Sequence, residues 1–177
     1  MYLKSLELHG FKSFPDKVKL EFNKGISAVV GPNGSGKSNI GDAMRWVMGE
    51  QSSKTLRGGR MEDVIFNGSK SRPKAGFAQV TLTIDNEDRA LEADTDIVSV
   101  SRKLYRNGDS EYMINGAPSR LKDIVELFMD TGLGRDGYSI IGQGKIADIV
   151  SSKSTERREI FEEAAGISKF RYKKEEA

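Results

Sequence analysis

The fold of this 177-residue chain is decided by the stretch Gly31-Pro32-Asn33-Gly34-Ser35-Gly36-Lys37-Ser38. The stretch matches the pattern G-x-x-x-x-G-K-[ST] of a phosphate-binding loop at every fixed position. Glycines let backbone N–H groups turn toward an anion without a Cβ in the way, and a helix N-terminus adds partial positive charge. The lysine would bridge the β- and γ-phosphates, and the last serine hydroxyl would ligate Mg²⁺. The sequence therefore predicts a site for a nucleoside triphosphate.

The residues on either side of the loop fit a strand that leads in and a helix that leads out. Residues 26–30 form a nearly continuous apolar run, which predicts a strand buried on both faces. After the loop, apolar residues recur at helical spacing and predict a helix that Gly49 ends; they are Ile40, Ala43, Met44, Val47 and Met48. This order favours a phosphate-binding loop over a glycine-rich turn that binds nothing.

The rest of the chain carries further strand and helix patterns, so an α/β fold is expected. Alternation or short apolar runs predict strands around 6–8, 18–22, 78–84, 98–104 and 111–114. The dipeptide Asn107-Gly108 predicts a hairpin turn between the last two strands. Ser119 is the expected N-cap of a helix over 121–128, and a charged helix is expected from about residue 155.

Composition excludes several classes of site. The chain has no Cys and one His, which excludes a disulfide scaffold, a thiol nucleophile, a Cys-ligated zinc site and a multi-His metal site. No apolar run approaches the ~20 residues that span a bilayer, and the first residues lack a signal-peptide pattern, so a cytoplasmic protein is expected. Basic residues gather in 51–76 and acidic residues in 85–96. This segregation fits one positive surface, but charge alone favours two solvated loops.

Hydrolysis of a nucleotide needs more than the phosphate loop. An acidic residue at the end of a second buried strand must support Mg²⁺, and another group must orient water. Asp85 follows a run that alternates and Asp130 follows a run with helical spacing, so neither fits, and no ABC-type Ser-Gly-Gly signature occurs. The charged helix still runs at Ala177, as in a cut chain. The sequence therefore predicts half of a site, which another chain or a missing segment completes.

Short motifs follow one another along the chain: LHGFKSF at 8–14, GPNGSGKSN at 31–39, WVMGEQ at 46–51, LRGG at 56–59, DVIF at 63–66, GQGKI at 142–146 and FEEAAGI at 161–167. In this order they resemble the N-terminal head segment of the structural maintenance of chromosomes (SMC) ATPases, most of all the bacterial condensin type. The resemblance implies a P-loop NTPase of the ABC-ATPase type. Residues 1–154 would form the N-terminal lobe of a split head, and 155–177 would begin a coiled-coil helix.

The resemblance also implies a set of site residues. Gln143 would reach Mg²⁺ and the attacking water, Arg57 would add positive charge beside the phosphates, and Lys37 would complete the catalytic set. Mg²⁺ would be held by Ser38 and Gln143. Without the resemblance, Arg57 is one member of a solvated basic run and Gln143 is a polar loop residue. The residues implied to bind ATP are Lys12, Ser13, Gly31, Pro32, Asn33, Gly34, Ser35, Gly36, Lys37, Ser38, Asn39 and, on the adenine side, Asp63.

Partners and function are implied in the same way. The C-terminal half of the head would supply the signature motif and the Walker B acids, so this segment alone should hydrolyse ATP very slowly or not at all. Joined to that half and engaged with a second head in a homodimer, it would use ATP and Mg²⁺ to drive DNA entrapment, chromosome condensation and segregation. Kleisin-type subunits would assist, in the cytoplasm at the nucleoid and with no membrane partner.

A DNA surface and some alternatives complete the expectations. Arg60, Arg120 and Lys122 would contact phosphates of double-stranded DNA without reading its sequence, or they are ordinary surface charges. One alternative function is the head of a related RecF- or RecN-like repair ATPase. Another is a nucleotide-dependent docking module without turnover, and an ABC transporter subunit is a weaker alternative.

Overall fold

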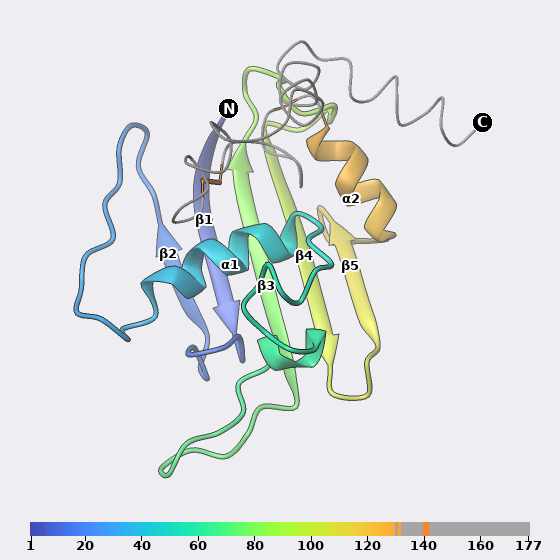
Figure 1. Ribbon diagram of the computed structural model, residues 1–177. Coiled ribbons are helices and arrows are strands. Elements are labelled where there is room, and N and C mark those ends of the chain that lie inside the picture. Colours follow the sequence, from blue (N-terminus) through green and yellow to red (C-terminus); the bar gives the residue numbers. More distant parts are fainter. Residues whose placement is uncertain (130, 132–139, 142–177) are drawn as a thin grey trace, which may run out of the picture.

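The computed structural model describes residues 1–129, 131, 140 and 141 of the chain. It has two layers, a six-stranded antiparallel sheet in the order β2-β1-β3-β4-β5-β6 and a helix, α1, that crosses one face of it (Figure 1). The elements are β1 (Tyr2–His9), β2 (Val18–Glu21), α1 (Lys37–Val47), the 3₁₀ helix η1 (Met61–Val64), β3 (Phe77–Asp85), β4 (Ile97–Tyr105), β5 (Ser110–Ile114), β6 (Ala117–Ser119) and α2 (Leu121–Phe128). The α/β fold class is confirmed.

The core lies between α1 and the sheet. The central strands β1, β3 and β4 place alternate side chains on the covered face, because successive residues of a strand point to opposite sides. The helix contributes a stripe at helical spacing whose members Ala43, Trp46 and Val47 are fully buried. On the opposite face of the sheet polar side chains predominate, and the hydroxyls of Thr81 and Ser101 lie 3.1 Å apart across two strands. Burial of one face therefore fixes the register of the sheet.

Most predicted elements are confirmed. Strands occur at 2–9, 18–21, 77–85, 97–105 and 110–114, and the Asn107-Gly108 turn joins the last two. The helix after the phosphate loop ends where expected, at Gly49, whose φ of 113° lies in the left-handed region. The helix expected from residue 155 lies outside the described residues.

The prediction of a buried strand at 26–30 is wrong for this chain. These residues form no strand, and Ile26 and Val30 are 103% and 88% exposed. A buried strand needs a neighbouring strand for its N–H and C=O groups and a layer on each face. In the described part of the chain the sheet is made by other segments, and 26–30 pairs with none of them. The apolar run therefore lies uncovered beside the phosphate loop.

The predicted N-cap of the second helix is also wrong. Ser119 ends β6, and α2 begins one residue later than a cap at that position would place it, after Arg120. The Asp123 carboxylate, in the first turn, accepts a hydrogen bond from the Arg120 backbone N–H at 2.8 Å. A carboxylate there satisfies a free N–H and also favours the positive end of the helix, which a hydroxyl does less well.

A buried arginine caps the C-terminal end of α1. Arg102 is 3% exposed, and its Nη1 donates to the backbone carbonyls of Trp46 and Glu50 at 2.8 Å each. Its guanidinium lies 4.6 Å from the centre of the Trp46 ring and 5.3 Å from that of Tyr112. Burial lowers the pKa of Arg102 from its ordinary value, because the charged form loses water. These contacts fasten the end of α1 to β4.

The cap predicts a stability effect. We expect Arg102→Met to lower the free energy of unfolding by about 2–4 kcal/mol, because it removes a charged donor from the Trp46 and Glu50 carbonyls and also removes the stacked guanidinium. Denaturant unfolding measures the loss. The control is Lys103→Met on the opposite face of the same strand, where the ammonium is half-exposed over Phe77 and Tyr105, and which should cost about 1 kcal/mol or less. Equal losses in both variants would rule out the capping role.

Candidate nucleotide-binding site

The phosphate loop leads directly into the N-terminus of α1. Gly34 and Gly36 have φ values of 83° and 92°, in the region that only glycine enters without strain. A Cβ on Gly36 would lie 2.6 Å from the Ser13 hydroxyl oxygen, so the loop also needs glycine for space. The Asn39 N–H donates to the Gly36 carbonyl at 2.9 Å and starts the helix. The arrangement aims the free N–H groups of the first turn at an incoming anion.

The loop lysine lies inside this loop. Lys37 Nζ donates to the carbonyls of Gly31 and Pro32 at 2.6 and 2.7 Å. These contacts hold an ammonium group at the place where phosphates would be bound. Ser38 follows on the first turn of α1 and is exposed, as a hydroxyl that ligates Mg²⁺ must be. The loop therefore fits a triphosphate with its metal ion.

A tight turn after β1 brings two more predicted residues to the loop. Phe11 and Phe14 close the turn through paired backbone hydrogen bonds of 3.1 and 2.8 Å. The Lys12 N–H donates to the Val64 carbonyl at 2.7 Å, which ties the turn to η1. Ser13 Oγ accepts a hydrogen bond of 2.8 Å from Asn39 Nδ2. Residues that are far apart in the sequence are thus side by side in the fold.

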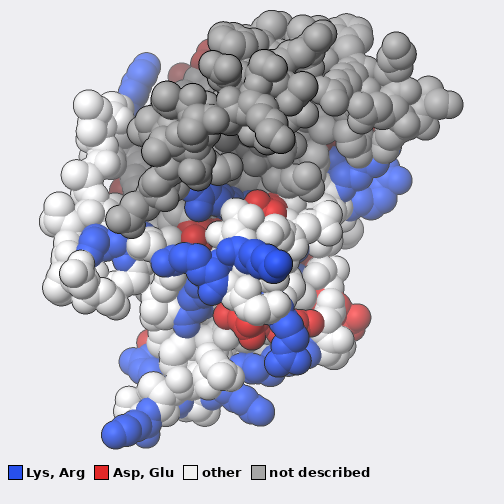
Figure 2. All heavy atoms as spheres, in the orientation of Figure 1, with Lys and Arg blue, Asp and Glu red and all other residues white. Residues whose placement is uncertain are grey.

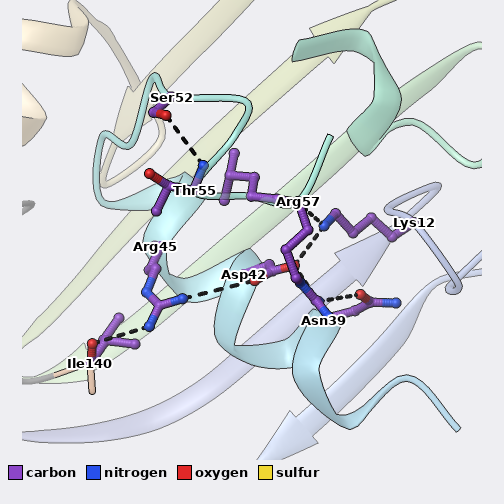
Figure 3. A network of polar contacts seen from close by, with 9 residues as sticks. Lys12, Asn39, Asp42, Arg45, Ser52, Thr55, Arg57 and Ile140 are labelled. Atoms are coloured by element: carbon purple, nitrogen blue, oxygen red, sulfur yellow. Dashed lines mark hydrogen bonds and ion pairs between the residues drawn. The ribbon is translucent and has the colours of Figure 1, made fainter. Parts of the chain in front are cut away.

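The predicted arginine lies in the same place. Arg57 donates from Nη2 to Asn39 Oδ1 at 2.9 Å and from Nε to Asp42 Oδ2 at 3.1 Å (Figure 3). Lys12 Nζ donates to the same oxygen at 2.6 Å and also to the Leu56 carbonyl. Asp42 is buried and accepts from both cations.

Asp42 is not among the site residues that the sequence predicts. Its spacing in the helix shows only that it lies off the apolar stripe, which usually means exposure to solvent. A signal was nevertheless present, because an acid one turn into a helix that begins Lys37-Ser38 lies close to any phosphate-binding cations. The fold brings Lys12, Ser13, Asn39 and Arg57 into one hydrogen-bonded network around it.

Asp63 has a structural task in the loop that holds Arg57. Its Oδ2 accepts hydrogen bonds from the backbone N–H groups of Arg60 at 2.9 Å and Gly59 at 2.8 Å. These bonds favour the charged form and so lower the pKa of Asp63 below its ordinary value. The side chain caps η1, and a contact with the adenine stays a prediction.

The predicted DNA-contact residues lie on separate elements. Arg60 precedes η1, whereas Arg120 and Lys122 lie at the start of α2. The Arg120 side chain is exposed and bonds Asp123 at 3.0 Å, and the Lys122 ammonium lies 3.8 Å from Glu126. Figure 2 shows basic side chains scattered over the described part of the visible face, with acidic ones among them. The structure does not gather these three residues at one point.

Asp85, which the sequence raised as a possible acid, lies away from the loop. Asp85 ends β3 and faces Tyr2 at the start of β1, whereas Lys12 follows the end of β1, so the two lie at opposite ends of the sheet (Figure 1). Among the described residues no three His, Asp or Glu side chains form a metal site, and none of the helices there could cross a membrane. Asp130 and Gln143 lie outside the described residues.

Comparison with known proteins gives consistent results. The RecF/RecN/SMC N-terminal domain matches residues 2–149. The chromosome partition proteins Smc of Clostridium kluyveri and Bacillus subtilis are 61% and 58% identical over all 177 residues, and this chain spans 15% of the length of each. A solved Smc head domain from Pyrococcus furiosus, with an extended coiled coil and bound to the C-terminal domain of ScpA, is similar at a TM-score of 0.88 and 41% identity. That match covers 99% of this chain and 44% of the other.

The geometry of the loop predicts a sharp difference between two glycines. We expect Gly36→Ala to weaken binding of a fluorescent ATP analogue at least tenfold, because the new methyl group would meet Ser13 and an L-residue in this conformation costs about 1–2 kcal/mol. Gly41→Ala, within α1 and with open space at its Cβ, is the control. It should keep binding unchanged and stabilise the helix by about 1 kcal/mol. Similar binding by both variants would contradict the proposed loop geometry.

Proposed function

Because this chain belongs to the RecF/RecN/SMC N-terminal domain family, we propose that it is the ATP-binding half of an SMC head. The observation that carries the proposal is the phosphate loop itself, set at the start of α1 with Lys12, Arg57 and Lys37 gathered beside it. A site with that much positive charge and free backbone N–H groups suits the triphosphate of ATP.

Each residue has a proposed task. The loop N–H groups and Lys37 bind the phosphates, and Ser38 holds Mg²⁺, which bridges phosphate oxygens and neutralises developing charge. Arg57 and Lys12 add positive charge where the transition state needs it. Ser13 and Asn39 fix the turn after β1 against the loop through their mutual hydrogen bond. Gln143 is proposed to orient the attacking water, and Asp63 to border the adenine.

A second segment is proposed to complete the head. The apolar run 26–30 lies uncovered, and an exposed apolar surface of this kind favours a partner. The described residues at the loop include no acid free to support hydrolysis, since Asp42 is engaged by two cations. The C-terminal half of the head would cover the run and supply the Walker B acids and the signature motif.

The biological setting follows from the relatives. Relatives named chromosome partition protein Smc, at 58% and 61% identity, favour an SMC head over a RecF- or RecN-like one. We propose that two such heads engage as a homodimer, that ATP hydrolysis drives DNA entrapment, chromosome condensation and segregation, and that a kleisin-type subunit binds the head. The solved head from Pyrococcus furiosus is bound to part of ScpA, which supports the last point. Arg60, Arg120 and Lys122 would contact DNA at the nucleoid, in the cytoplasm.

The direct test measures ATP hydrolysis by this chain alone and by the complete head, which is this chain joined by the C-terminal half of the same head. We expect no measurable turnover alone, turnover on addition, and none in a complete head carrying Lys37→Ala, because this lysine contacts the phosphates. Steady turnover by the chain alone would contradict the half-site. If the complete head does not turn over and Lys37→Ala instead abolishes association of the halves, the chain is a docking module.

The exposed run predicts where the two halves meet. We expect Ile26→Asp and Val30→Asp each to weaken association with the C-terminal half at least tenfold, because a charge would be buried in the joint sheet. The stability of this chain alone should change by less than about 0.5 kcal/mol, since both side chains are exposed in it. Ile97→Asp, at an exposed apolar residue at the start of β4, is the control and should leave association unchanged. Equal binding by all variants would place the contact elsewhere.

A further inference from the structure

The network beside the phosphate loop has a buried carboxylate at its centre (Figure 3). Asp42 Oδ2 accepts from Lys12 Nζ at 2.6 Å and from Arg57 Nε at 3.1 Å, and Arg57 Nη2 makes a further short contact with the same oxygen. The Asp42 side chain is only 4% exposed, whereas that of Arg57 is 52% exposed. Asp42 therefore cannot contact a nucleotide itself, but the arginine that it holds can.

The backbone gives a second, independent observation. Among the described residues other than glycine, φ is positive at Lys12, Arg57, Arg89 and Asn115. The first two, at 47° and 58°, are the two partners of Asp42. Such conformations persist only where the surroundings hold them, and they collect at functional sites. Lys12 and Arg57 thus each lie in a strained turn, and both side chains are bound by Asp42.

Charge explains why an anchor is needed. Lys12 and Arg57 are both cations and both lie within hydrogen-bonding distance of one carboxylate oxygen, so they would repel each other without it. With Asp42 included, the group keeps one net positive charge to meet a triphosphate. Loss of the carboxylate would raise that charge while releasing the two cations from their positions. Loss of Asp42 would therefore favour the binding of an anion but would disturb the placement of the two cations.

We propose that Asp42 is a positioning residue, which holds Lys12 and Arg57 beside the phosphate loop so that they meet the transferring phosphate in the right geometry. The inference rests on the proposed ATPase function and deepens it. The same carboxylate also faces Arg45, at 4.0 Å from its Oδ1, and Arg45 donates to the Ile140 carbonyl at 3.1 Å. The anchor is therefore also connected to a segment far along the chain.

Kinetics of the complete head test the proposal. We expect Asp42→Asn to lower kcat at least tenfold while the Kd for ATP stays within threefold or becomes tighter. Asp16→Asn, which removes the acid of an exposed ion pair with Arg72, is the control and should change neither value. In a double-mutant cycle with Arg57→Ala, the two losses in kcat should be strongly non-additive, since Asp42 acts through Arg57. If the losses in kcat are additive and parallel the losses in thermal stability, Asp42 has only a structural role and the proposal is overturned.

A second measurement does not depend on hydrolysis. Lys12 is protected by burial and by Asp42, so an amine-acylating reagent read out by mass spectrometry should label it slowly without nucleotide. Asp42→Asn should speed labelling of Lys12 several-fold and leave Lys17, which is exposed, unchanged. If the unaltered head does not hydrolyse ATP, the proposed function fails, but Lys12 labelling still decides whether Asp42 is the anchor. Unchanged labelling would overturn the proposal.

If Asp42→Asn does not fold, a milder variant tests the same role. Asp42→Glu keeps the charge but moves the carboxylate by one methylene group. We expect it to lower kcat about threefold or more at unchanged Kd and to raise Lys12 labelling. Values equal to those of the unaltered head in both measurements would overturn the anchor role.

Discussion

The packing of α1 across the sheet is the interaction on which the rest of the molecule depends. Ala43, Trp46 and Val47 are fully buried against the covered face, so the helix can neither turn nor slide without opening the core. Its two ends are thereby fixed as well. The N-terminal end carries the phosphate loop, and the C-terminal end is fastened to β4 by Arg102. The proposed phosphate-binding loop is therefore attached to a helix that the core holds in place.

The candidate site is assembled from segments that are distant in the sequence. The turn after β1, the start of α1 and the loop that contains Arg57 meet through hydrogen bonds between side chains rather than through shared secondary structure. Two of these segments hold a residue other than glycine at positive φ, Lys12 in the turn after β1 and Arg57 in its loop. The network therefore does two tasks, since it holds the loops together and also gathers positive charge where a triphosphate would bind.

The same structure explains why the head is proposed to need a second segment. Among the described residues the sheet that supports α1 is antiparallel, and the run 26–30 that leads to the loop takes no part in it. The apolar side chains of this run suit one strand of a different sheet, which the proposed C-terminal half of the head would complete. The chromosome partition proteins Smc that this chain matches are much longer, since the chain spans 15% of their length.

The sequence by itself determined whatever depends on near neighbours along the chain. Spacing of apolar residues located α1 and five strands, the fixed residues of 31–38 located the loop, and Asn107-Gly108 located a hairpin. Only the tertiary structure decided what depends on distant residues. The run 26–30 stays uncovered because a strand needs a neighbouring strand. Asp123, and not Ser119, accepts the hydrogen bond at the start of α2. Asp42 is buried between Lys12 and Arg57. The periodicity of apolar residues shows on which face of a helix or strand a residue lies. It does not show that two distant cations, Lys12 and Arg57, share one carboxylate, because this depends on how remote segments of the chain fold together.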